Sequence, residues 1–262
     1  MKVTTKILIF FILSWLYSWS GNIGDFFFPS DFWKTPMISQ GPILAAITVI
    51  FLTEGWKGLG VWLRRVLQFK APLYVYGAAL FGTLAIIFAS VSLTMLISGD
   101  SPKPEEIAAL PSVLMAAPMI VFLGGPFGEE PGFRGYGQHT LHQVMSPLTA
   151  SLWVGLGVLV WHIPQFVVGG ITPGIAVAIV AVSVVYAWLY QAGGSVWPLI
   201  VLHGTVNTIN GVFFGRMLDA QEKLIEQGFI SFFFVCWAVF LAWRLGPTLG
   251  HPVRGRESAA AA

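Results

Sequence analysis

Long apolar runs, separated by short polar segments, recur along the whole chain. An α-helix rises about 1.5 Å per residue, so about 20 apolar residues are needed to cross a hydrocarbon core about 30 Å thick. Eight runs approach this length, at residues 6–20, 41–55, 72–97, 110–130, 148–168, 173–191, 196–214 and 228–245. The pattern therefore predicts an all-α fold, a polytopic membrane protein with about eight transmembrane helices.

Composition narrows the class of function. Of 262 residues, 56% are hydrophobic and only 10% are charged, whereas a typical soluble domain has about 25% charged residues. The formal net charge is +2, and the basic residues lie in short loops rather than along one stripe. We therefore expect the lipid bilayer as the surroundings of this protein and no nucleic acid as a partner.

The runs follow one another without a linker or a soluble segment between them. We therefore interpret residues 1–262 as a single integral membrane domain, with a flexible tail over residues 246–262. The first run is short and follows Lys2 and Lys6, which would suit a cleaved signal peptide. Seven further runs favour an uncleaved anchor instead.

Loop charge predicts the orientation, because Lys and Arg are retained on the cytoplasmic side. An inward N-terminus places ten basic residues inside and four outside, which predicts two cytoplasmic termini in the cytoplasmic membrane. The inner set is Lys2, Lys6, Lys57, Arg64, Arg65, Lys70, Arg134, Arg244, Arg254 and Arg256, and the outer set is Lys34, Lys103, Arg216 and Lys223. Residues 56–70 have apolar residues at helical spacing with basic residues between them, which suits either an interfacial helix or a charged loop that sets topology.

Polar side chains inside the apolar runs are few and costly, so each one is a candidate for function. The candidates are Glu129, Glu130, Arg134, His162, His203 and Asn207. Glu130 and Arg134 are four residues apart and can pair on one helix face. Glu129 points about 100° away from that face and is left free to titrate or to orient a water. Alternatively, both acids simply pair with Arg134 at the end of the helix.

The backbone around the two acids is rich in glycine and proline, in the stretch GGPFGEEPG at 124–132. Irregular backbone at membrane depth is tolerated only where it faces protein or a wet cavity, so we expect an intramembrane cavity here. Counting from the predicted turn at Ser146 and Pro147 places Glu129 and His162 at nearly the same level of an antiparallel hairpin. If this hairpin projects into the cytoplasm, His139 and His142 become solvated loop residues rather than metal ligands.

These side chains suit peptide-bond hydrolysis in two ways. In one, Glu129 and a histidine act as general base on a water, while the other histidine and Asn207 donate hydrogen bonds to the oxyanion. In the other, Glu129, His162 and His203 hold a catalytic zinc ion. We favour the first, which needs no cofactor, because an asparagine one turn after His203 suits an oxyanion donor better than a zinc ligand.

The three motifs together resemble the CPBP intramembrane protease family, also called the Abi or CAAX-protease-like family. Its Glu-Glu-x-x-x-Arg motif stands at Glu129 to Arg134, and its His-x-x-x-Asn motif at His203 to Asn207. Its Phe-x-x-x-His motif ends at His162, with Val158 in place of the phenylalanine. The resemblance covers about residues 110–212, which we take as the catalytic core.

The resemblance implies an intramembrane endopeptidase of the glutamate type that acts on a membrane-associated protein or peptide. Glu129 would be the catalytic glutamate, supported by Glu130 and Arg134, and His203 its partner in activating water. His162 and Asn207 would be the oxyanion donors. The family also includes proteins linked to immunity or scaffolding, so the alternative is a non-catalytic membrane protein of the same fold.

Overall fold

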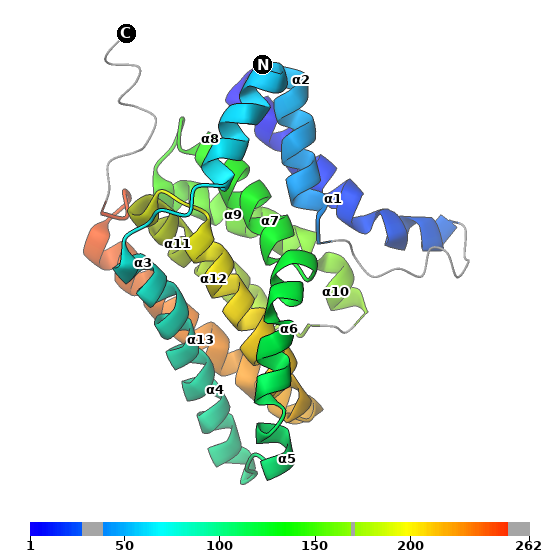
Figure 1. Ribbon diagram of the computed structural model, residues 1–262, viewed down its shortest axis with the longest axis vertical. Helices are drawn as coiled ribbons and strands as arrows, with labels where there is room; N and C mark the ends of the chain where they lie inside the picture. Colours follow the sequence, from blue (N-terminus) through cyan, green and yellow to red (C-terminus); the bar gives the residue numbers. More distant parts are fainter. Residues whose placement is uncertain (28–38, 169–170, 251–262) are drawn as a thin grey trace.

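The computed structural model describes residues 1–27, 39–168 and 171–250, which form helices without any β-strand (Figure 1). This confirms the all-α prediction. The α-helices are α1 Val3–Phe27, α2 Gly41–Val66, α3 Leu73–Gly77, α4 Thr83–Ser98, α5 Pro104–Ile107, α6 Leu110–Leu123, α7 Pro126–Gly132, α8 His139–Leu141, α9 Pro147–Trp161, α10 Ile163–Val167, α11 Ile175–Gly193, α12 Trp197–Thr205 and α13 Ala220–Leu245. The π-helical stretches are η1 Ala78–Gly82, η2 Phe133–Gln138 and η3 Val206–Phe213, and η4 Phe214–Arg216 is a 3₁₀ turn.

Six helical stretches of the described chain are long and apolar enough to cross a membrane, so the predicted number of eight is not confirmed. They are Val3–Gly24, Gly41–Val66, Leu73–Ser98, Leu110–Leu141, Ile175–Gly193 and Ala220–Leu245. The two other predicted runs form shorter helices. α9 stops at Trp161, and a separate short helix begins at Ile163, with a proline as its second residue. α12 passes into the π-helical η3 after nine residues.

α11 is the centre of the bundle. It packs against α9 on one side and α13 on the other, and α13 in turn packs on α4 (Figure 1). Among the six candidate spans α11 is the most buried: 61% of its most apolar 18-residue stretch lies inside the bundle. A helix that is apolar all round is expected to lie inside such a bundle.

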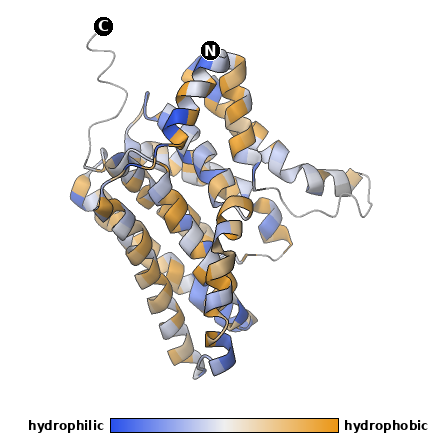
Figure 2. Cartoon of the chain, viewed as in Figure 1, coloured by the Kyte–Doolittle hydropathy of each residue, from blue (hydrophilic) through white to orange (hydrophobic). Residues whose placement is uncertain are grey.

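The outer faces of the bundle are apolar rather than polar. Figure 2 shows hydrophobic colouring along most of α4 and α13. Large side chains such as Phe81, Leu96, Phe232 and Trp243 are more than half exposed. Exposing these apolar side chains to water would cost free energy, whereas exposing them to lipid tails would not. The apolar outer surface is therefore consistent with a position inside a membrane.

α2 bends at Gly55, where φ is 63° and ψ is −161°, and continues as a helix to Val66. Residues 56–66 are thus helical, which fits the interfacial-helix interpretation of 56–70 better than the loop. The chain leaves the helix at Leu67, so the predicted segment is helical over most of its length.

His139 and His142 do not lie in the solvated loop that we predicted. His142 is fully buried and its Nε2 lies 2.7 Å from Nε2 of Gln138, which is also fully buried. His139 Nδ1 lies 3.1 Å from the Tyr190 hydroxyl. The prediction was wrong because η2 and α8 extend the helix up to Leu141 and turn these polar side chains onto α11.

The start of the predicted tail is ordered against the bundle. The Pro247 carbonyl accepts a 3.0 Å hydrogen bond from the Leu148 amide, and Leu249 is fully buried. The rest of that tail, residues 251–262, lies outside the described residues, as does Lys34 of the predicted outer set.

α7 approaches the start of α2 through two glycines four residues apart, Gly128 and Gly132. A Cβ on Gly132 would lie 2.4 Å from the Pro42 carbonyl, and one on Gly128 would lie 2.7 Å from the Ser39 carbonyl oxygen. Small residues at this spacing let two membrane helices approach to backbone contact.

We expect Gly132→Ala to destabilise the protein by about 1–3 kcal/mol, because the added methyl group forces the two backbones apart. A thermal unfolding series in detergent measures this effect. Gly60→Ala is the matched control, since a Cβ there meets no atom within 4 Å. Equal unfolding temperatures for the two variants would contradict close packing of α7 on α2.

Candidate active site

All six polar residues singled out from the sequence line a single cavity of about 170 Å³. The cavity lies between α7, α9, α11, α13 and the helix formed by α12 and η3. Its wall is otherwise mostly apolar. The full lining is Glu129, Glu130, Arg134, Val158, His162, Ile171, Ile175, Ala178, Ile179, Val182, Tyr186, Leu202, His203, Val206, Asn207, Ile230 and Phe234.

A break between α6 and α7 brings the acids to this cavity. α6 ends at Leu123, and Gly125 adopts φ 128° and ψ −58°, a conformation that residues with a side chain rarely adopt. Pro126 then opens α7, because proline is suited to the first turn of a helix. The chain therefore starts a new helix within the bundle, with both acids in or next to its first turn.

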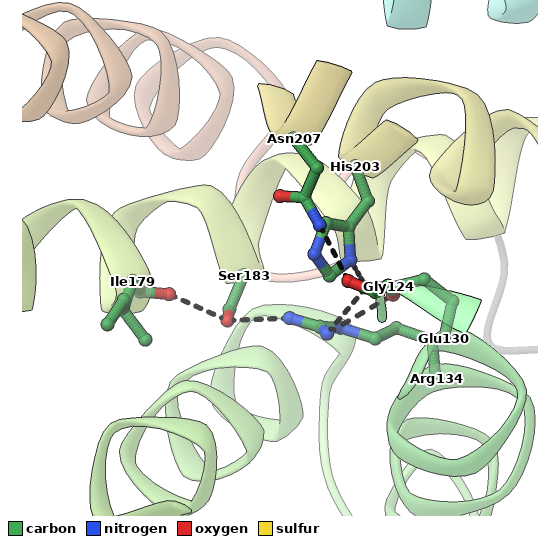
Figure 3. Close-up of polar contacts among 7 residues, drawn as sticks. All are labelled: Gly124, Glu130, Arg134, Ile179, Ser183, His203 and Asn207. Atoms are coloured by element: carbon green, nitrogen blue, oxygen red, sulfur yellow. Dashed lines mark hydrogen bonds and ion pairs between the residues drawn. The ribbon is translucent and has the colours of Figure 1, made fainter. Parts of the chain in front are cut away.

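Glu130 and Arg134 form a buried ion pair, as their spacing predicted. Arg134 Nη1 lies 3.2 Å from Oε1 and 3.1 Å from Oε2 of Glu130 (Figure 3). The side chains are 0% and 2% exposed. Such a pair is stable inside a low-dielectric bundle only where further hydrogen bonds satisfy the remaining donors and acceptors.

α11 supplies part of that further support, from residues that sequence reasoning missed. Arg134 Nη2 donates a 3.0 Å hydrogen bond to the Ser183 hydroxyl, which itself donates to the Ile179 carbonyl (Figure 3). The guanidinium carbon lies 4.2 Å from the centre of the Tyr186 ring, a cation–π contact. In the sequence, the sign of this support was a serine and a tyrosine three residues apart within the apolar run 173–191.

His203 hydrogen-bonds the paired acid of the two. Its Nδ1 lies 2.8 Å from Oε1 of Glu130, not of Glu129 (Figure 3). A carboxylate can only accept, so Nδ1 carries the hydrogen, and in the neutral ring Nε2 is an acceptor. Glu130 therefore holds both Arg134 and His203.

The Glu129 carboxylate is left without a hydrogen bond to any described residue. It is 6% exposed and lines the cavity. A Cβ on Gly125 would lie 2.7 Å from its Oε1, so only glycine leaves room for this carboxylate. Of the two adjacent acids, Glu130 is paired with Arg134 and His203, and the carboxylate of Glu129 is available to a molecule in the cavity.

His162 caps the end of α9, and its ring is held by its own helix. Nδ1 donates to the Val158 carbonyl at 2.8 Å, and the ring meets the edge of Trp161 at a centroid distance of 4.8 Å. Val158, which replaces the expected phenylalanine, thus contributes its backbone to this contact. Because Nδ1 carries the hydrogen, neutral His162 presents Nε2 as an acceptor, which disfavours the predicted role of oxyanion donor.

Asn207 connects η3 to the helix break. Its Nδ2 donates to the Gly124 carbonyl at 3.2 Å (Figure 3), and the second hydrogen of that amide is available to the cavity. Nδ2 would lie 3.5 Å from a Cβ on Gly125, so Asn207 and Glu129 converge on the same glycine.

The alternative zinc site does not fit this arrangement. Among the described residues, no group of three His, Cys, Asp or Glu side chains is arranged to hold a metal ion. The geometry of Glu129, His162 and His203 therefore does not make the ligand set that the zinc hypothesis required.

Comparison with known proteins agrees with the motifs. A family model described as Type II CAAX prenyl endopeptidase Rce1-like matches residues 110–209, a segment that holds all six polar residues. This match confirms the resemblance inferred from the sequence. No curated protein matches the chain.

We expect Arg134→Met to lower stability by about 3–5 kcal/mol, because it leaves Glu130 buried without its counter-charge. Adding Glu130→Gln in the same chain should recover part of this loss. Thermal unfolding in detergent measures both. Glu54→Gln is the control, since its pair with Lys6 is partly exposed, and such pairs contribute at most about 1 kcal/mol. Similar losses from Arg134→Met and Glu54→Gln would contradict the importance of the buried pair.

Proposed function

We propose that this chain is an intramembrane endopeptidase of the glutamate type, because residues 110–209 match the family model described as Type II CAAX prenyl endopeptidase Rce1-like. It would hydrolyse a peptide bond in a membrane-associated protein or peptide. The observation that carries this proposal is the unpaired Glu129 carboxylate in the cavity that also holds His203.

In the proposed reaction, a water binds between Glu129 and His203. Glu130 holds His203 with Nε2 as an acceptor, so the water can donate one hydrogen to Nε2 and the other to Glu129. Glu129 removes a proton as the water oxygen attacks the peptide carbonyl. The same proton is then delivered to the departing amine, which leaves Glu129 ionised for the next cycle.

Asn207 is the proposed donor to the oxyanion, through the hydrogen of Nδ2 that does not bond Gly124. His162 presents an acceptor in its neutral form, so we assign it to orienting the substrate through a backbone N–H. This changes the role inferred from the resemblance, while the residue stays in the site. The reaction needs no metal ion at any step.

We expect Glu129→Gln to lower kcat by about 10²–10⁴-fold, because it removes the base while keeping the shape of the side chain. Asn207→Ala should lower kcat by about 10²–10³-fold through loss of one oxyanion donor. His203→Ala should also abolish most cleavage. Purified variants are compared on membrane-tethered peptide libraries, with and without a prenyl group, by mass spectrometry.

The same assay separates the proposed enzyme from its rivals. Glu54→Gln serves as control and should cleave like the wild type. If the wild type cuts no peptide and the Glu129 and His203 variants lose only stability, the polar cluster is a structural tie in a scaffold protein. If a strong chelator abolishes cleavage and zinc restores it, the metal-free mechanism is wrong.

We expect Gly125→Ala to lower kcat at least as much as Asn207→Ala, because the methyl group would meet Oε1 of Glu129 at 2.7 Å and strain a φ of 128°. Steady-state kinetics on the best library peptide measures this. Gly77→Ala is the matched control, since a Cβ there meets nothing within 4 Å. Wild-type kcat in Gly125→Ala would show that Glu129 does not need its present position.

A further inference from the structure

The part of α2 that follows its bend carries basic side chains that the proposed reaction does not use. In Figure 1 this part is the cyan helix at the end of the molecule where the N-terminus lies. Positions 55–99 contain no acidic residue, and Glu54 just before them is paired with Lys6 at 2.7 Å. Within the described chain, none of the basic side chains that follow the bend is paired with a carboxylate. They are Lys57, Arg64, Arg65 and Lys70.

One face of this stretch fixes it to the rest of the protein. Trp62 and Val66, four residues apart, are buried, and Trp62 Nε1 and Val66 Cγ2 would each lie 3.7 Å from a Cβ on Gly135 in η2. Trp197 Nε1 donates a 2.9 Å hydrogen bond to the Val66 carbonyl. The other faces of the stretch are therefore held in a defined direction.

A second face is apolar and exposed. Trp56, Leu63 and Leu67 point within about 40° of one another, because successive residues of a helix are turned by about 100°. Their side chains are 76%, 46% and 49% exposed, respectively. Tryptophan and leucine on one exposed side of a helix are typical of helices that lie at the boundary between lipid tails and headgroups.

The third face is basic and lies about 90° from the apolar one. Lys57 and Arg64 are seven residues apart, so they point within about 20° of each other, and both are exposed. Gly60 lies between them along the helix, and a Cβ there would meet no atom within 4 Å. Arg64 Nε donates to the Gly60 carbonyl at 3.2 Å, which turns the guanidinium back over the glycine toward Lys57. The result is an open notch with a cation on each side.

A phosphodiester fits the chemistry of this notch. Its two non-ester oxygens accept hydrogen bonds, and its negative charge matches a guanidinium and an ammonium group. The apolar face next to the notch fits the acyl chains that such a headgroup carries. A soluble anion or an acidic peptide would leave that apolar face exposed, so the two faces together favour a lipid.

We propose that Lys57, Gly60 and Arg64 form a binding site for the headgroup of an anionic phospholipid, whose acyl chains lie against Trp56 and Leu63. Anionic lipids are preferred over zwitterionic ones because basic residues near the membrane surface attract their net charge. The site does not depend on the proposed peptidase activity.

The test measures lipid binding to the purified full-length protein in detergent by native mass spectrometry. Phosphatidylglycerol is the anionic probe and phosphatidylcholine the zwitterionic one. The wild type should bind phosphatidylglycerol about 30-fold more tightly, at about fivefold for each of the two basic side chains. Lys57→Gln combined with Arg64→Gln should bind the two lipids equally.

Two matched controls separate the notch from general effects of charge and bulk. Lys103→Gln with Arg216→Gln removes the same charge from exposed residues, and Lys103 lies next to α5, at the opposite end of the molecule (Figure 1). This variant should keep the wild-type preference, because distant exposed charges are screened. Gly60→Leu keeps every charge but fills the notch, and should weaken phosphatidylglycerol binding by about tenfold. Gly228→Leu adds the same bulk at another glycine with open space around it and should change nothing.

Equal binding of the two lipids by the wild type would overturn the proposal, and so would an unchanged preference in the Lys57 and Arg64 double variant. A site for soluble anions is a further outcome that contradicts it. In that case inorganic phosphate would displace phosphatidylglycerol, and Trp56→Ser with Leu63→Ser would leave its binding unchanged. No step measures peptide cleavage, so failure of the proposed peptidase function leaves this test intact.

Discussion

The buried ion pair between Glu130 and Arg134 is the contact on which the cavity depends. Neither charge could remain inside an apolar bundle alone, because the desolvation cost of an isolated ion is several kcal/mol. The pair draws Ser183 and Tyr186 from α11 and His203 from α12 around it. The helices that form most of the cavity wall thus meet at one guanidinium and one carboxylate.

This pair also separates the roles of two adjacent acids. Successive residues of a helix point about 100° apart, so Glu129 and Glu130 cannot share the same partners. Glu130 contacts both basic side chains, whereas the Glu129 carboxylate has no hydrogen bond to a described residue and faces a mostly apolar cavity. The proposed water activation uses both arrangements: a paired carboxylate that orients a histidine, and a free carboxylate that faces the cavity.

Irregular backbone accompanies the site on several sides. The break at Gly124 and Gly125 admits the acids, α9 stops at His162, and η3 carries Asn207. Backbone of this kind is tolerated at membrane depth where it faces protein or a cavity. Regular helices would have been more stable individually, but would have directed these side chains elsewhere.

The sequence by itself determined the membrane-embedded all-α class, the pairing of Glu130 with Arg134 and the set of residues around the cavity, because apolar run length and helical spacing are local properties. Tertiary structure alone decided that His203 pairs with Glu130, that His142 is buried and that six stretches of the described chain are long and apolar enough to span. Spacing along one helix tells which side chains share a face. It does not tell which residue of another helix that face will meet, since this depends on how the helices pack.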